Sequence, residues 1–295
     1  MKFDVIARHR IWFTISSLLV IISLVSIFTK GFNLGIDYTG GTIVEVQFTQ
    51  NVEVAQVRES LKTFNLENSV IQLSGGSNDT SGKDVMIRTR NLTPNESKAV
   101  IDNMTKTIGE NQTKRIESVG AVIGSEVTQH AIINLVVAFV ALALYISYRF
   151  EYKIAISALI AIFHDLIMVL GVFSFFQLEI DSSFLAAILT VIGYSMNECV
   201  VIFDRIRENT HTHKRTDTFA DLANASIAQS IHRSFYTLST TLFACLALFF
   251  FGGDTTKNFA LVMIIGFISG CYSSICVATS LWNMWKTRVK NRQRA

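Results

Sequence analysis

The chain has 295 residues, of which 50% are hydrophobic, and a formal net charge of +3 at pH 7. Its hydrophobic residues fall into blocks that approach the ~20 residues needed to span a bilayer, which excludes a purely soluble globular protein. The small positive charge follows from membrane topology and gives no reason to expect a nucleic-acid partner.

Six apolar segments are long enough to form transmembrane helices. They cover residues 11–29, 131–148, 154–176, 184–203, 236–251 and 259–282. The first is longer than the apolar core of a signal peptide, and no small-residue cleavage site follows it, so we expect it to be retained. All four cysteines fall within these segments, so no disulfide framework is expected in the polar stretch after the first segment.

Lysine and arginine residues mark alternate connections between the apolar segments. They gather near the N-terminus, between the second and third segments, at residues 204–235 and in the tail at residues 286–295. The connections at residues 177–183 and 252–258 contain Lys257 as their one basic residue. The positive-inside rule therefore predicts that both termini are cytoplasmic and that the long segment after the first helix is external.

The predicted organisation has four parts. These are the N-terminus with the first helix (1–30), an external domain (31–130), helices two to six with a cytoplasmic loop at 204–235 (131–285), and a basic cytoplasmic tail (286–295). The loop is expected to carry a cytoplasmic charge network made of Asp204, Arg205, Arg207 and Glu208.

The external segment alternates between strand and helix patterns. Strands are predicted at residues 42–48, 69–73, 84–88 and 114–119, and helices at residues 52–64 and 94–108. Thr93 and Pro94 form a helix-start signal. The order β-α-β-β-α-β predicts a small α+β ferredoxin-like domain attached to a polytopic α-helical membrane protein. Such a domain is either a spacer or a surface that contacts a translocating substrate or a partner domain.

Glycine-rich segments flank the external domain on both sides. The first contains Gly35, Asp37, Gly40 and Gly41, and the second contains Gly120, Gly124 and Glu126. Because glycine adopts backbone conformations that are closed to other residues, these segments are either hinges that let the domain move or ordinary tight turns.

Glu198 stands inside the fourth apolar segment, where a carboxylate costs about 3 kcal/mol on insertion scales. Tyr194 and Ser195 share its helix face by i,i+4 and i,i+3 spacing, and Asn197 adds a further polar group. An ionisable group at that depth is by default a functional hypothesis, so we predict that Glu198 handles an ion or a proton.

Further polar residues lie in the predicted helices. Arg233, near the start of the fifth, is either the cation partner of that carboxylate or an arginine that extends to the membrane interface. In the third, His164 and Asp165 are either a relay or a polar pair that locks helix packing. The same polar interface is expected to include Thr237 and Thr240. The sequence shows no metal-typical spacing of His and Cys, so no metal is predicted.

Five segments carry a family resemblance. They are residues 35–41 (GIDYTGG), 119–126 (VGAVIGSE), 191–209 (VIGYSMNECVVIFDRIREN), 226–233 (SIAQSIHR) and 237–241 (TLSTT). In this order they resemble the characteristic segments of the SecF family, the smaller half of the bacterial SecD/SecF accessory translocase in the RND transporter superfamily. The resemblance covers nearly the whole chain, and the longest of the five segments is very specific.

The resemblance implies a role and a set of partners. SecF acts with SecD, uses the proton-motive force or in some members a sodium gradient, and helps to draw unfolded polypeptide out of the SecYEG channel. The chain would then be one six-helix half of an RND-type unit, surrounded by membrane lipid in a bacterial inner membrane and completed by a SecD-like subunit. The resemblance implies no enzymatic activity and no cofactor beyond the coupling ion, H⁺ or Na⁺. It matches Arg233 to the motif arginine of the family.

One position departs from the family pattern. Glu198 stands where the family normally has aspartate. The extra methylene moves the carboxylate by roughly 1 Å or more, which leaves the coupling and the choice of ion open. The alternatives to a coupled subunit are a scaffold of the translocase without coupling and an RND-type transporter of small molecules or lipids. The short external domain and the single half of a pump disfavour the transporter.

Overall fold

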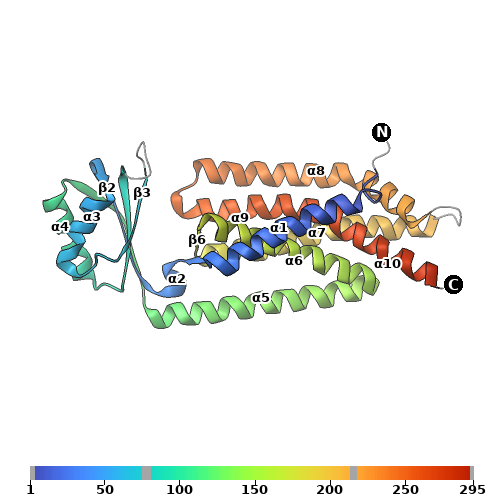
Figure 1. Ribbon diagram of the computed structural model, residues 1–295, viewed down its shortest axis with the longest axis horizontal. Helices are drawn as coiled ribbons and strands as arrows, with labels where there is room; N and C mark the ends of the chain where they lie inside the picture. Colours follow the sequence, from blue (N-terminus) through green and yellow to red (C-terminus); the bar gives the residue numbers. More distant parts are fainter. Residues whose placement is uncertain (1–3, 75–80, 213–217, 293–295) are drawn as a thin grey trace. The chain divides into compact units, whose positions relative to one another are not determined.

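The structure, a computed structural model, describes residues 4–74, 81–212 and 218–292. Two compact units make up the chain (Figure 1). The membrane unit comprises Met1–Asn33 and Ile133–Ala295, and the external unit comprises Leu34–Ile132.

Long helices make up the membrane unit. They are α1 (His9–Lys30), α5 (Ala121–Arg149), α6 (Tyr152–Phe176), α7 (Ser182–Thr212), α8 (Phe219–Phe251), α9 (Asp254–Tyr272) and α10 (Thr279–Arg292), with the π-helix η2 (Ser273–Ala278) between the last two. Of these, α5 begins in the external unit and ends in the membrane unit. Among the described residues, six helical stretches are long and apolar enough to cross a membrane, the sixth running from α9 through η2 into α10. The prediction of six transmembrane helices is therefore confirmed.

The predicted loop at residues 204–235 is wrong over its described residues, which are almost entirely helical. Helix α7 continues to Thr212, and a capping box between Thr218 and Asp221 starts α8. Charged residues indicated a loop, yet Ile206 is only 1% exposed among them. Apolar burial on one face therefore keeps the polar extension of α7 helical.

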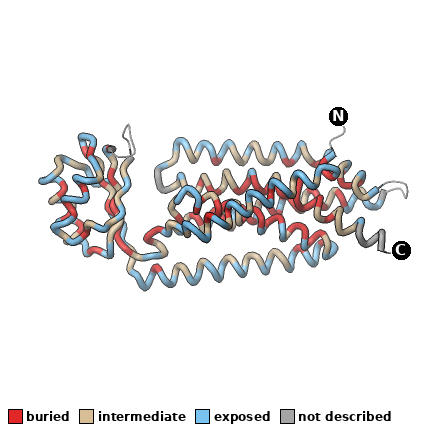
Figure 2. The backbone as a smooth tube through the Cα atoms, in the orientation of Figure 1, coloured by how far each residue is buried: buried red, intermediate tan, exposed pale blue. Residues whose placement is uncertain are grey.

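Helices α6, α7 and α9 form the buried centre of the membrane unit, with α1 packed on α6 and α8 packed on α7 and α9 (Figure 2). At least 50% of the apolar window of α6, of α7 and of the last span is buried, against 17% for α1, 11% for α8 and 6% for α5. The outer helices therefore present apolar side chains outward, as expected of surfaces that meet lipid or another membrane subunit.

The external unit is a four-stranded sheet with helices packed on one face. Its strands are β2 (Gly41–Glu53), β3 (Val70–Ser74), β4 (Ser81–Thr89) and β5 (Asn111–Val119), and its helical segments are α2 (Ile36–Thr39), α3 (Val54–Leu61), η1 (Lys62–Phe64) and α4 (Pro94–Thr107). The strand order is β3-β4-β2-β5, and each neighbouring pair is antiparallel. The two-residue strands β1 (Asn33–Leu34) and β6 (Glu179–Ile180) lie outside this sheet.

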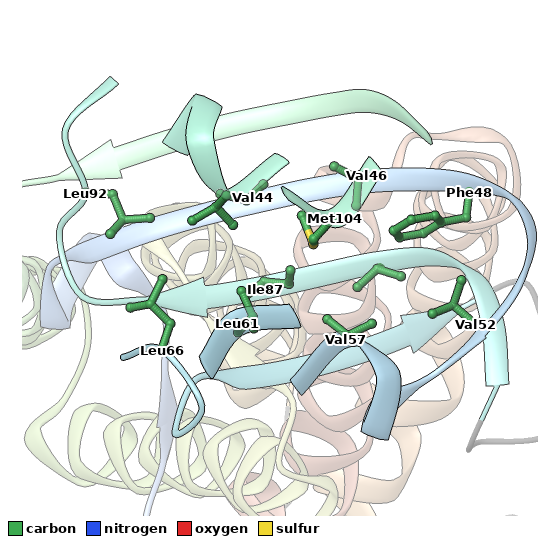
Figure 3. Close-up of a cluster of buried hydrophobic side chains, with 12 residues drawn as sticks. Val44, Val46, Phe48, Val52, Val57, Leu61, Leu66, Ile87, Leu92 and Met104 are labelled. Carbon is green, nitrogen blue, oxygen red and sulfur yellow. The ribbon is translucent and has the colours of Figure 1, made fainter. Parts of the chain in front are cut away.

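Alternate side chains of β2 build the core of the external unit. Val44, Val46 and Phe48 are each at most 1% exposed, and they pack with Leu61 from α3 and Met104 from α4 (Figure 3). A strand with one face buried requires this two-residue period, which the sequence shows at the same positions.

The helix predicted at residues 52–64 is shorter in the structure. Strand β2 continues through Glu53, because the ladder with β4 resumes after an irregularity and pairs Val52 with Gly82. Helix α3 then begins at Val54, and its last turn gives way to η1. The apolar residues at helical spacing, Val54, Val57, Leu61 and Phe64, all lie in α3 and η1, and cross-strand pairing takes only the two residues before them.

Candidate ion-coupling site

Asp165 in α6 lies at the centre of a buried polar cluster in the membrane unit, and its side chain is 1% exposed. One carboxylate oxygen accepts hydrogen bonds from Ser269 Oγ at 2.6 Å and, in the tautomer with a proton there, from His164 Nδ1 at 3.1 Å. The other oxygen accepts from Ser195 Oγ at 2.6 Å and from Ser273 Oγ at 2.7 Å. Hydroxyl donors at these distances match an ionised carboxylate.

The serine donors reach Asp165 from α7, α9 and η2. Ser269 and Ser273 are four residues apart and so share a helix face. Ser273 is also the first residue of the π-helix, a rare element that recurs at functional sites. Gly270 lets α9 come close to α7, because a Cβ there would lie 3.1 Å from the Cβ of Ser195. The cluster therefore ties the third, fourth and sixth spans together.

His164 is buried beside this cluster, and one of its ring nitrogens is unused. Nδ1 contacts Asp165, whereas Nε2 is buried and forms no hydrogen bond with any described residue. The ring of Tyr272 lies 6.2 Å away between centroids. The two residues predicted as a relay or a packing pair are thus in contact, and the geometry is compatible with both roles.

Glu198 lies one helical turn beyond Ser195 on α7 and is 2% exposed. Its Oε2 atom is buried and has no partner at hydrogen-bond geometry among the described residues. The hydroxyl groups of Tyr194 and Ser234 also lack such a partner, and they lie beside the carboxylate as its nearest potential donors. Arg233 in α8 acts on the carboxylate electrostatically, without a direct ion pair among the described residues. Tyr194 therefore lies beside Glu198, whereas Arg233 is exposed and acts on the carboxylate through its charge alone.

An unpartnered carboxylate oxygen at this depth limits the states that Glu198 can adopt. An ionised carboxylate away from water is strongly unfavourable unless it is paired and hydrogen-bonded. A proton on Glu198, or a cation closer to it than Arg233, would lower this cost.

Three predicted residues lie away from the Glu198 carboxylate. Asn197 is exposed, because one residue along a helix turns the side chain to another face. Thr237 Oγ1 and Thr240 Oγ1 donate to carbonyl groups of their own helix at 2.9 and 3.0 Å. The structure does not bring these three side chains into the site.

The sequence reasoning missed three serines of the site. Ser269 and Ser273 donate to Asp165, and Ser234 lies beside Glu198. A single hydroxyl in an apolar helix commonly bonds to a carbonyl of the same helix, so it carries little information on its own. The available signal was the i,i+4 spacing of the first two, which does not reveal an acceptor on another helix.

Part of the predicted charge network forms at the end of α7. Arg205 donates to Glu208 at 2.5 Å, and Asp204 forms an ion pair with Arg149 of α5 at 3.5 Å. Arg207 takes no part in these contacts and lines a cavity of the membrane unit. The four residues are therefore neighbours in sequence but not one network among the described residues.

The glycine segments predicted as hinges pack against each other within the external unit. Gly40 has a φ of +71°, and a Cβ there would lie 2.8 Å from the Cα of Ala121. A Cβ on Gly124 would lie 2.9 Å from the carbonyl oxygen of Tyr38. Gly41 has a φ of +130°. Backbone meets backbone here, so the chain needs glycine at these positions.

The remaining residues of the two glycine segments lie at or near the starts of α2 and α5. Gly35 precedes α2, Asp37 lies in its first turn, Gly120 has open space where a Cβ would stand, and Glu126 is exposed. The close contacts at Gly40 and Gly124 fit the tight-turn alternative at those two positions.

Two family profiles match the chain. One, described as the SecD/SecF GG motif, matches residues 25–52. The other, described as the C-terminal part of the protein export membrane protein SecD/SecF, matches residues 99–288 and includes Asp165, Glu198 and Arg233. The second match alone covers more than half of the chain.

Relatives named protein translocase subunit SecF are similar over nearly the full length. The chain is 44% identical to the one from Acidaminococcus fermentans over 292 residues, which covers 98% of this chain and 99% of the relative. It is 39% identical to the one from Haemophilus influenzae over 279 residues, which covers 92% of this chain and 83% of the relative.

Solved structures of SecDF share the fold. The crystal structure of SecDF from Thermus thermophilus, described as a translocon-associated membrane protein, is 32% identical with a TM-score of 0.87 and covers 97% of this chain. A second SecDF structure, in a form called super-membrane-facing, is 32% identical with a TM-score of 0.73 and covers 99% of this chain. This chain spans 39% and 40% of those two SecDF chains. With its six spans, the chain belongs to the SecF family of protein translocase subunits.

Proposed function

We propose that this chain is an ion-driven accessory subunit of protein export at the bacterial inner membrane, and that Glu198 binds the coupling ion, H⁺ or Na⁺. The observation that carries the proposal is the buried Glu198 carboxylate, whose Oε2 forms no hydrogen bond with the described residues. A proton or a small cation would complete that site.

The cluster around Asp165 anchors the helix that carries Glu198. Ser195 connects α7 to Asp165, and Glu198 follows three residues later on the same helix. A change of charge at Glu198 would therefore act on a helix that is anchored one turn away. The membrane potential supplies about 2.3 kcal/mol per charge for each 100 mV crossed, enough to bias a conformational step.

The partner in this proposal is a SecD-like subunit. Such a subunit would correspond to the part of the SecDF chain that this chain does not span, since this chain spans 39% of it. The poorly buried helices α1, α5 and α8 offer apolar surface for it and for lipid. The wider assembly would include SecYEG and the unfolded polypeptide in transit, with both termini of this chain cytoplasmic.

The external unit also has a role in the proposed function. We infer that it is a ferredoxin-like module on the outer side of the membrane. The element order and the strand order β3-β4-β2-β5 support this inference. Its role would be to contact the emerging polypeptide or the external part of the partner.

The test is export of a secreted reporter protein in cells that rely on this chain. Glu198→Gln removes the ionisable group at nearly constant size, and Glu198→Asp restores the residue usual in the family. Moving one charge across 100 mV supplies about 2.3 kcal/mol. Because about 1.4 kcal/mol changes a rate tenfold, loss of this step in Glu198→Gln should slow export more than tenfold.

The matched control is Glu59→Gln, which removes a carboxylate from an exposed position in the external unit. Export should proceed at the wild-type rate in this control and in Glu198→Asp. If export is also normal in Glu198→Gln, the chain is a scaffold without coupling and the proposal fails.

A further inference from the structure

A cavity of about 320 Å³ opens in the membrane unit, where α5 ends and α6 begins and where α7, α8 and α10 meet them. Its lining comprises Arg149, Phe150, Glu151, Ile154, Ile206, Arg207, Thr210, His211, Phe219, Trp282 and Lys286. These residues are separate from the cluster around Asp165 and from Glu198. The lining combines basic and apolar side chains.

The apolar part of the lining is well buried. Phe150 is 7% exposed, Ile154 5%, Ile206 1% and Trp282 2%. The ring of Phe219 meets that of Trp282 edge-on, with centroids 6.2 Å apart. A rigid aromatic and aliphatic floor of this kind suits a ligand with an apolar part.

The charged part of the lining is basic. Arg149, Arg207 and Lys286 face one carboxylate, Glu151, which forms an ion pair with Lys286 at 2.6 Å. Arg149 is paired at 3.5 Å with a carboxylate outside the lining, that of Asp204. Arg207 forms no ion pair with another residue in the described part of the chain, so its guanidinium has donors available for an anion.

Trp282 supplies a second and independent observation. Its indole Nε1 is buried and has no acceptor among the described residues. A buried N–H without an acceptor is unfavourable, and the donor lies in a residue that lines the cavity. A ligand oxygen would satisfy it.

Two exposed tyrosines place the cavity at the membrane surface. Tyr148 is 93% exposed and Tyr152 is 68% exposed, and they flank the lining residues Arg149, Phe150 and Glu151 in sequence. Tyrosine is enriched at the level of lipid headgroups, where its ring is apolar and its hydroxyl is hydrated. The two tyrosines therefore favour a position of the cavity at headgroup depth, within reach of lipid.

We propose that this cavity binds the phosphodiester headgroup of an anionic phospholipid. Arg207 and Trp282 Nε1 would donate to phosphate oxygens, and the apolar floor would contact the glycerol backbone and the first methylenes. Guanidinium groups match phosphate oxygens in charge and geometry, and basic pockets between transmembrane helices are typical of such headgroup sites.

The test is retention of lipid by the full-length protein in detergent, measured by native mass spectrometry after addition of phosphatidylglycerol or phosphatidylcholine. The wild-type protein should retain phosphatidylglycerol in preference to phosphatidylcholine. Arg207→Gln should weaken that retention about tenfold, the usual effect of losing a hydrogen bond between charged groups. Trp282→Phe keeps the aromatic floor, removes only the N–H and should weaken retention severalfold.

Arg205→Gln is the matched control, since it removes one positive charge from the same helix without touching the cavity. It should retain phosphatidylglycerol as the wild type does. Unchanged retention in both Arg207→Gln and Trp282→Phe would overturn the proposal. Absence of a preference for phosphatidylglycerol, together with displacement of bound lipid by millimolar inorganic phosphate, would make this a soluble-phosphate site and would also overturn it.

Discussion

The hydroxyl of Ser195 donates a 2.6 Å hydrogen bond to the carboxylate of Asp165, which joins α7 to α6 in the middle of the membrane unit. Glu198 follows one turn later on α7 and is equally buried, at 2% exposed. The two carboxyl groups have opposite surroundings. Asp165 accepts hydrogen bonds from three serine hydroxyls and contacts His164 Nδ1, whereas Glu198 has an oxygen with no hydrogen bond among the described residues. One is suited to hold helices together, and the other is suited to exchange an ion.

Removal of the Ser195 hydroxyl should loosen this junction. Ser195→Ala deletes one of two serine donors to the same Asp165 oxygen, and a hydrogen bond to a charged group is worth about 1.5–3 kcal/mol. We expect a lower thermal unfolding midpoint, measured on the full-length protein in detergent by labelling of newly exposed cysteines. Ser239→Ala is the control, because among the described residues that hydroxyl bonds only to Phe235 O of its own helix. Equal midpoints for the two variants would contradict the assignment.

Asp165→Asn should destabilise the membrane unit more than Ser195→Ala. An amide of the same size presents N–H donors to hydroxyl groups that are already donors, and it loses the charge that strengthens their bonds. We expect a loss of about 2 kcal/mol or more of unfolding free energy. The same cysteine-labelling assay reports it, since Cys199 is 1% exposed and contacts Ser274 at 3.1 Å. A variant as stable as the wild type would show that the serines do not hold an anion.

The close contact at Gly40 in the external unit predicts that two glycine-to-alanine substitutions have different effects on proteolysis. Gly40→Ala would place a Cβ 2.8 Å from the Cα of Ala121 and would force an alanine to a φ of +71°. Overpacking and strain of this kind cost about 1–3 kcal/mol each. Gly120→Ala lies one residue from the same helix start, and its Cβ would meet open space. Limited proteolysis should therefore cut the first variant faster than the wild type and leave the second unchanged. Equal cleavage of both would contradict the close contact.

The lowered pKa of Glu96 predicts that the capping of α4 in the external unit depends on pH. A hydrogen bond from the backbone of Thr93, with further bonds from the side chains of Arg90 and Thr93, lowers the pKa of Glu96 from 4.5 to about 2. Because the folded-state pKa lies below the unfolded value, the capping contribution is complete above about pH 4.5 and is lost as the pH falls towards 2. Hydrogen exchange in the first turn of α4, corrected for intrinsic rates, should show protection that falls over this window. Glu96→Gln should show a flat profile there, and a flat profile in the wild type would contradict the capping box.

Local signals made part of the site predictable. Glu198 and Tyr194 are four residues apart on one helix, so periodicity alone placed them side by side. The start of α4 was equally local, because Thr93 and Pro94 are adjacent. The Asp165 cluster was not predictable in this way. Its serines lie 30, 104 and 108 residues away, and their meeting depends on the rotation and register of helices, which a single sequence does not define.

The extent of α7 and α8 shows the same limit. The charges of residues 204–235 are typical of a loop, yet burial of Ile206 and Ile227, each 1% exposed, extends both helices into that region. Contacts between these extensions, such as Asn209 Nδ2 to Ser226 Oγ at 2.9 Å, form only after folding. Tertiary packing therefore decided these boundaries, and composition did not.

The most direct test of the coupling role of Glu198 is the dependence of reporter export on an imposed ion gradient. Export would be measured in membrane vesicles that contain this chain and its SecD-like partner, with the proton or sodium gradient raised in steps. With the wild-type protein, export should rise with one of the two gradients. With Glu198→Gln it should stay at the level found without a gradient, and Glu198→Asp should restore the rise. An undiminished rise in Glu198→Gln would contradict the account.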